Sequence, residues 1–146
     1  MIDPVTEARL QELLRRESRS FLQYARQANP WAGTEDRASL DNILAMSQAE
    51  ESLLEELAAY LQSHHVRLPA IGAFPMAFTS YNYVSVRALF SPLVREQRKA
   101  IAALEQDRAA LADPDAVSLA DRLLEIKKRH LCELEKLSGA AHPSGC

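Results

Sequence analysis

Glycine and cysteine are both scarce in this sequence. Its 146 residues include only 4 Gly and 2 Cys. There is no glycine-rich loop of the kind that binds phosphate. Cys132 and Cys146 form neither a CxxC pair nor a disulfide framework, which favours a reducing compartment. We therefore expect a cytoplasmic protein.

Long apolar runs and a strong net charge are also missing. No stretch is long enough and apolar enough to span a bilayer. Residues Met1–Pro4 lack the basic region followed by an apolar region that marks a secretory signal, so we expect none. The formal net charge of -3 gives no general attraction to nucleic acid or to an anionic membrane. We expect partners of neither kind.

The composition is typical of one helical domain. Hydrophobic residues make up 47% and charged residues 25% of the chain, and its frequent Ala, Leu, Glu, Arg and Gln favour helix. Asp3-Pro4 and Asp113-Pro114 suit helix starts, because Asp caps free amides and Pro fits the first turn. We expect one bundle over residues 1–139, followed by a flexible tail over 140–146. The predicted helices span about 4–28, 35–65, 80–112 and 114–138.

The connection between the second and third predicted helices is long. Val66–Thr79 contains Pro69, Gly72 and Pro75, which prevent a regular helix. Its roughly fourteen residues, when extended, reach roughly 45 Å, enough to run the length of a bundle. The other two connections are short, so each should join an antiparallel pair. The sequence thus predicts an all-α four-helix bundle with one long crossover between helices 2 and 3.

Polar residues interrupt the apolar stripe of the last predicted helix. Lys127 and His130 lie three residues apart and share a helix face. The stripe reads Leu119, Leu123, Lys127, His130, Leu134 and Leu137. We expect both side chains to point toward the centre of the bundle.

Each of the other predicted helices has an acid at mid-length in its apolar stripe. Glu17 lies in the first helix. In the second helix Glu51 continues the more regular line, although its neighbour Glu50 competes because the two point about 100° apart. In the third helix Glu96 is favoured and Gln97 competes. We expect these acids to meet Lys127 and His130.

Aromatic residues lie close to this predicted centre. Tyr24 shares the face of Glu17, and we interpret it as a buried phenol that donates to a carboxylate. The aromatic side chains of the crossover region could line a ligand pocket, but packing against the bundle is the favoured interpretation. They are Phe74, Phe78, Tyr81 and Tyr83.

In helix order, crossover position and part of its motif, the chain resembles the ferritin-like superfamily. Members with a dinuclear iron or manganese centre take one Glu from each of two helices and a Glu-x-x-His from each of the other two. Glu17 and Glu96 match the single glutamates. Residues 51–54 supply the Glu of one Glu-x-x-His motif but have Leu54 in place of His. Residues 127–130 supply the other His but begin with Lys instead of Glu.

Two hypotheses follow from this degenerate motif. In the first, Lys127 links the carboxylates, no cofactor is bound, and a non-catalytic bundle acts by homodimerisation or by binding a protein partner. In the second, Glu17, Glu51, Glu96 and His130 hold one iron, manganese or zinc ion, and redox activity is open. An ammonium within hydrogen-bond reach of two carboxylates favours the first hypothesis. An ammonium that reaches outward to solvent favours the second.

The sequence gives no catalytic residues that we can assign. There is no defensible Ser-His-Asp spacing. Cys132 and His130 are two residues apart on a helix, so they do not face each other as a nucleophile and its base. The non-catalytic hypothesis is therefore favoured, and the redox activity of the second hypothesis stays open.

Overall fold

The computed structural model describes residues 2–139, and over these residues the protein is all-α. Helices account for 75% of them and no strand is formed. The all-α prediction is confirmed. The predicted tail and Cys146 lie outside the described residues. The α-helices are α1 (Pro4–Ser18), α2 (Phe21–Tyr24), α3 (Arg37–Ser63), α4 (Val86–Ala110) and α5 (Pro114–Leu137), and the 3-10 helices are η1 (Thr34–Asp36) and η2 (Met76–Tyr81).

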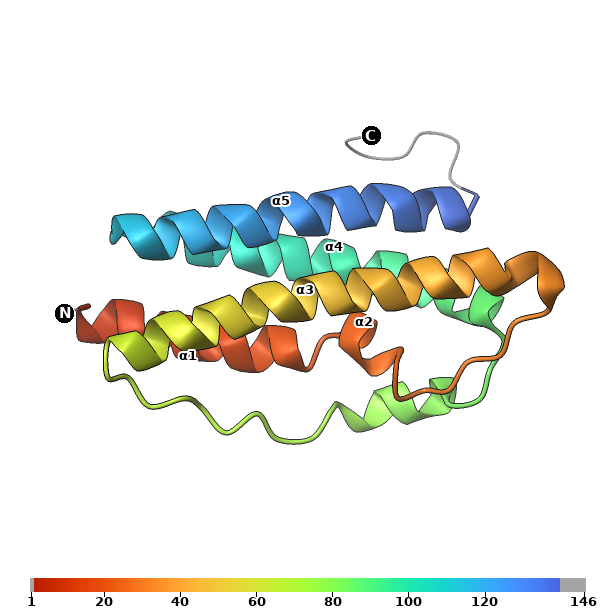
Figure 1. Cartoon of the computed structure of the whole chain (residues 1–146), viewed down its shortest axis with the longest axis horizontal. Helices are drawn as coiled ribbons and strands as arrows, with labels where there is room; N and C mark the ends of the chain where they lie inside the picture. The colour runs from red at the N-terminus through yellow and green to blue at the C-terminus, as the bar shows by residue number, and fades with distance from the viewer. Residues whose placement is uncertain (1, 140–146) are drawn as a thin grey trace.

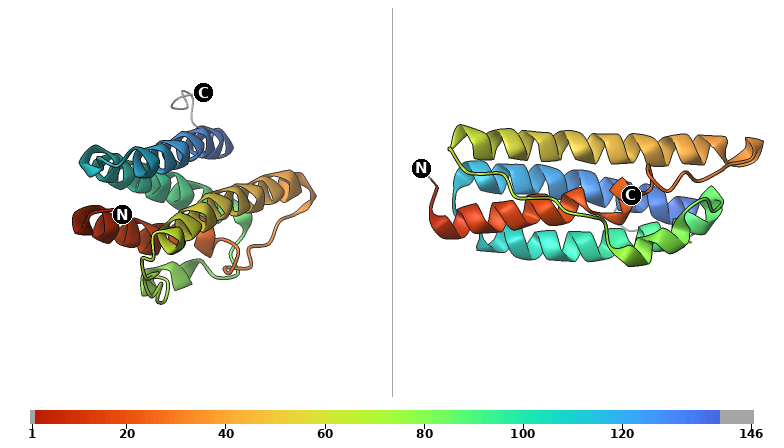
Figure 2. Two further views of the ribbon diagram at one scale, coloured as in Figure 1. Left: turned by 60° about the vertical axis from the view of Figure 1, so that its left-hand side comes forward. Right: turned by 90° about the horizontal axis from the view of Figure 1, so that it is seen from below.

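The long helices lie side by side in two antiparallel pairs (Figure 1). α1 and α2 run together in one direction and α3 returns beside them, while α4 and α5 form the second pair. The segment between α3 and α4 passes back along the outside of α1 and α3 (Figure 2). α3 and α4 therefore point the same way. No helix over residues 2–139 is long and apolar enough to cross a membrane.

The Asp-Pro helix starts are confirmed. The Asp3 carboxylate accepts from the Thr6 amide at 2.9 Å, and the Asp113 carboxylate accepts from the Ala116 amide at 3.0 Å. In both helices Pro occupies the first turn, where its missing amide hydrogen costs nothing.

The first predicted helix, 4–28, is interrupted, so this prediction was wrong in its extent. α1 ends at Ser18, and α2 begins two residues after Arg19. The Ser20 hydroxyl accepts from the Gln23 amide at 3.2 Å and caps α2. A serine hydroxyl that accepts from a backbone amide three residues further on competes with helix continuation.

The third predicted helix begins later than residue 80. A 3-10 helix covers Met76–Tyr81, and α4 starts only at Val86. Tyr83 has a φ of 60°, which no α-helix accepts. Its amide donates to the Ala28 carbonyl at 2.8 Å, so the chain pairs with the connection after α2 before entering α4.

The aromatic residues of the crossover region pack on α2, as the favoured interpretation predicts. Phe74 and Phe78 contact Tyr24, and Phe78 and Tyr81 stack edge-on against Phe21. Tyr83 is the exception, since 72% of it is exposed.

Candidate functional site

Lys127 lies at the centre of the helices with only 1% of its surface exposed. It is on the buried stripe of α5, between Leu123 and Leu134. Its Nζ donates to Oε1 of Glu50 at 2.7 Å. The same Nζ lies 2.8 Å from Oε1 of Glu17, an ion pair whose angles fall outside those of a hydrogen bond. One ammonium thus bridges carboxylates from α1 and α3.

Glu50 has the most complete set of partners at this site. Its second oxygen, Oε2, lies 2.6 Å from Nδ1 of His130 and accepts from Nε2 of Gln97 at 3.0 Å. Gln97 also contacts the carbonyl oxygen of Lys127 at 3.1 Å. An ionised carboxylate can only accept, so Nδ1 of His130 must carry the proton. Four helices thereby meet at one polar network.

The charges of this network stabilise one another. Burial acts to raise the pKa of Glu50, but the charge of Lys127 and the bonds from His130 and Lys127 outweigh it and lower that pKa to about 2. Burial acts to lower the pKa of Lys127, but Glu17 and Glu50 outweigh it and raise that pKa above its ordinary value. Lys127 and Glu50 therefore stay charged across the physiological range.

The network continues from Glu17 toward the start of α1. Nε of Arg16 lies 3.5 Å from Oε2 of Glu17, and the other end of the guanidinium pairs with Asp107 of α4 at 2.6 Å. Arg9 pairs with the same Asp107 at 3.1 Å. Positive and negative groups thus alternate from the half-exposed arginines of α1, through Asp107 of α4 and Glu17, to the buried Lys127 of α5 and Glu50 of α3.

Sequence reasoning did not assign a role to Asp107. The signal was present, because Asp107 falls three residues after Leu104 and four before Leu111, on the buried stripe of α4. A buried acid needs a cation as its partner, and the half-buried Arg16 supplies it.

Glu51 is not in the network, and this prediction was wrong. Glu50 takes the inward position with 2% of its surface exposed. The buried side of α3 follows the line Ile43, Ser47, Glu50, Leu54, Leu57 and Leu61. Glu51 points about 100° away from that line and pairs with Arg26 at the surface.

Glu96 is also outside the network, again because its neighbour faces inward. Gln97 is buried, on the line that runs through Leu93 and Ile101 of α4. Glu96 is partly exposed and lies 3.5 Å from Nζ of Lys99. α4 therefore contributes a neutral amide to the centre instead of a carboxylate.

Tyr24 does not donate to a carboxylate, which corrects the prediction for its hydroxyl. That hydroxyl donates to the side-chain oxygen of Asn82. A second buried polar pair lies next to the network. The side-chain nitrogen of Gln23, Nε2, donates to the Ser47 carbonyl at 2.8 Å. The Ser47 hydroxyl donates back to Gln23 at 3.0 Å.

The site does not present the ligand set of a metal centre. No group of three or more His, Cys, Asp or Glu residues is placed to hold a metal ion over residues 2–139. Of the four predicted ligands, only Glu17 and His130 reach the centre. The Lys127 ammonium lies between the two central carboxylates and would repel a metal cation.

No family model, curated protein or solved structure matches this chain. The central residues themselves therefore carry the information on function. Those residues form a closed ion network in which each charged side chain at the centre is nearly inaccessible to solvent.

Proposed function

We propose that this chain is a non-catalytic bundle of ferritin-like architecture that acts by association with itself or with a protein partner. In this proposal a charge-linked polar core replaces the dinuclear metal centre. The two antiparallel helix pairs and the crossover along their length support the architecture. In this proposal the network holds the helices together and binds no substrate.

The position of Lys127 is the single observation that carries this proposal. Its Nζ lies 2.7 and 2.8 Å from two carboxylates that could otherwise bind a cation. Displacing it would leave a buried ammonium without a partner, which is strongly unfavourable. Exposures of 1% for Lys127, 2% for Glu50 and 3% for Glu17 also leave no path for a substrate.

Two exposed aromatic residues support association. Trp31 is 62% exposed and Tyr83 is 72% exposed. Their segments are joined, because the Trp31 amide donates to the Val84 carbonyl at 3.1 Å. Trp and Tyr are enriched among the residues that dominate binding energy in protein interfaces.

Metal analysis tests the proposal. The purified protein is incubated with Fe²⁺, Mn²⁺ or Zn²⁺, desalted and measured by mass spectrometry, and we expect no retained metal. We expect Lys127→Glu to gain metal affinity, because it removes the cation and adds a ligand. Lys128→Glu is the matched control, since it makes the same charge change at an exposed neighbour.

The alternative function is a metal-binding protein, and the same experiment would reveal it. The contact between Glu50 and His130 is the observation that favours it, since both are metal-ligand types. Near-stoichiometric metal in the unaltered protein, lost in Glu50→Ala and in His130→Ala, would establish this alternative.

Association has its own test. Sedimentation of the protein over a range of concentrations, alone or with candidate partners, measures whether it assembles. We expect Trp31→Ser with Tyr83→Ser to weaken assembly without a change in helix content. A monomer at all concentrations that captures no partner through these residues would refute this part.

A further inference from the structure

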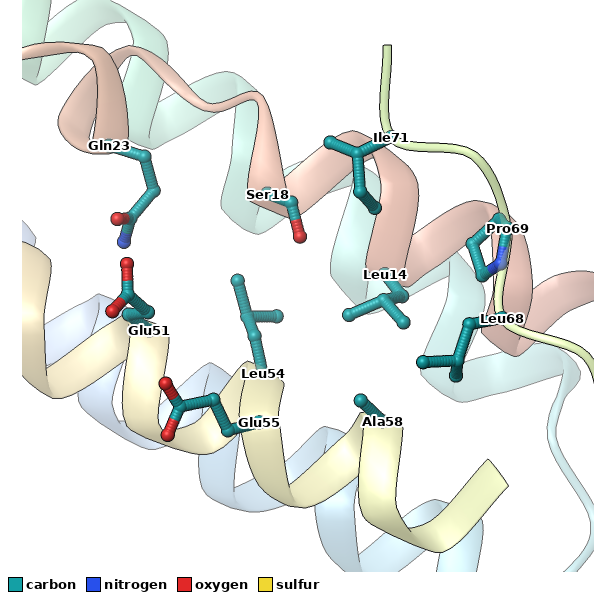
Figure 3. A pocket seen from close by; sticks show the side chains of 10 residues that line it. All are labelled: Leu14, Ser18, Gln23, Glu51, Leu54, Glu55, Ala58, Leu68, Pro69 and Ile71. Atoms are coloured by element: carbon teal, nitrogen blue, oxygen red, sulfur yellow. The ribbon is translucent and has the colours of Figure 1, made fainter. Parts of the chain in front are cut away.

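A pocket of about 270 Å³ lies away from the polar core, between α1, α3 and the start of the crossover (Figure 3). Its size is close to the lower limit of roughly 300 Å³ for pockets that take drug-sized ligands, so it suits a smaller molecule. Most of its wall is apolar. The apolar side chains are Leu14, Leu54, Ala58, Leu68, Pro69 and Ile71.

The crossover covers one side of this pocket, and two hydrogen bonds join it to α1 and to the residue after α1. Nε2 of Gln11 donates to the Arg67 carbonyl at 2.7 Å. A guanidinium nitrogen of Arg19 donates to the Ala73 carbonyl at 3.3 Å. Leu68 and Ile71 lie between the residues that make these two hydrogen bonds. The bonds hold this part of the crossover over the pocket.

The polar side chains of the pocket are not equivalent. Gln23 is bonded to Ser47, and Glu51 is paired with Arg26. The Ser18 hydroxyl and the Glu55 carboxylate line the pocket without a hydrogen-bond or ion-pair partner over residues 2–139. None of the ten lining residues is basic. The unpaired charge at the pocket is therefore negative.

We infer that this pocket binds a small organic cation with an apolar body, such as an alkyl ammonium. The apolar walls take the hydrocarbon part, since removing methylene groups from water is favourable. The Ser18 hydroxyl points into the pocket and can accept from the ammonium end, while the exposed Glu55 carboxylate lies at the edge of the pocket and supplies the negative charge (Figure 3). This inference is independent of the proposal for the core, because the pocket shares no residue with the network around Lys127.

Octylammonium, octanoate and octanol are the probes for the test. They have the same hydrocarbon chain and differ in the charge of the head group. Binding is measured by calorimetry and by the NMR shifts of the methyl groups of Leu54, Leu68 and Ile71. We expect octylammonium to bind at one site and to shift these methyls, octanol to bind more weakly, and octanoate to bind least. No binding of octylammonium, or equal affinity for all three probes, would overturn the inference.

Two kinds of variant locate the binding. Ala58→Phe fills the pocket from α3 and Ser18→Leu fills it from α1, so each should abolish binding, and helix content shows whether each variant folds. Glu55→Gln should weaken octylammonium about three- to fivefold, as expected for a partly exposed ion pair, and leave octanol unchanged. Glu125→Gln on α5 makes the same charge change at an exposed position outside the pocket. An equal loss in both glutamine variants, or unchanged binding in both filled variants, would contradict the assignment.

Discussion

Lys127→Met removes the central cation of the network while keeping a long apolar side chain. The Glu17 and Glu50 carboxylates would then remain buried, with exposures of 3% and 2%, and without their shared ammonium. Removing one partner of a buried ion pair costs about 3–5 kcal/mol. We expect the free energy of unfolding at pH 7 to fall by about that amount.

This loss is a large fraction of the total free energy of unfolding. A chain of 146 residues has a free energy of unfolding of roughly 7–22 kcal/mol, at roughly 0.05–0.15 kcal/mol per residue. The variant should therefore fold but should unfold at a clearly lower urea concentration. Urea titrations measure this difference, with helix content followed by far-ultraviolet circular dichroism.

Two comparisons separate the effect of charge from the effect of shape. Lys128→Met removes a charge from an exposed neighbour and should change stability by about 0.5 kcal/mol or less. Adding Glu50→Gln to Lys127→Met should recover part of the loss, because it removes one of the two unpaired carboxylates. A loss below about 1 kcal/mol in Lys127→Met, or strict additivity with Glu50→Gln, would show that Lys127 does not neutralise these acids in solution.

Two further predictions concern acid stability and a helix cap. The pKa of Glu50 in the folded protein is about 2, below its ordinary value of 4.5. Ionised Glu50 therefore contributes about 3 kcal/mol to the free energy of unfolding above pH 4.5, and this contribution is lost as the pH falls toward 2. Urea titrations should show a smaller loss over this range in Glu50→Gln than in the unaltered protein, and equal losses would contradict the pKa. Ser20→Ala removes the cap of α2 and should cost about 1 kcal/mol, measured by thermal unfolding against Ser52→Ala, whose hydroxyl contacts only its own helix.

The sequence predicts Lys127 and His130 well because their helix has a fixed start and a regular stripe. Asp113 and Pro114 locate the first turn, and the stripe that follows recurs at the three- and four-residue spacings of a helix. The same reasoning is less accurate where two polar residues are adjacent, as with Glu50 and Glu51. Their directions differ by only about 100°, and the choice depends on how α3 is rotated against its neighbours.

The break after α1 is harder to predict for a different reason. Ser18, Arg19 and Ser20 do not exclude helix by their propensities, which differ from that of Ala by well under 1 kcal/mol per residue. The break is favoured by the Ser20 cap and by the bond from Arg19 to the distant Ala73 carbonyl. Contacts that join residues far apart in the chain leave no periodic signal. The sequence allowed a pocket lined by the aromatic residues of the crossover, but the observed pocket is lined by none of them. Its lining could not be predicted for the same reason.

The polar network has a consequence for how the helices align. Leucines recur at nearly every turn of α5, so a slide of this helix by one turn, about 5.4 Å, would still bury apolar side chains. The same slide would carry Nζ of Lys127 away from both carboxylates, which now lie 2.7 and 2.8 Å from it. Lys127, Glu17 and Glu50 would lose their shared ion pairs, at a cost of about 3–5 kcal/mol for a single broken pair. Apolar packing therefore holds the helices together, and the network around Lys127 selects the one alignment in which its charges meet.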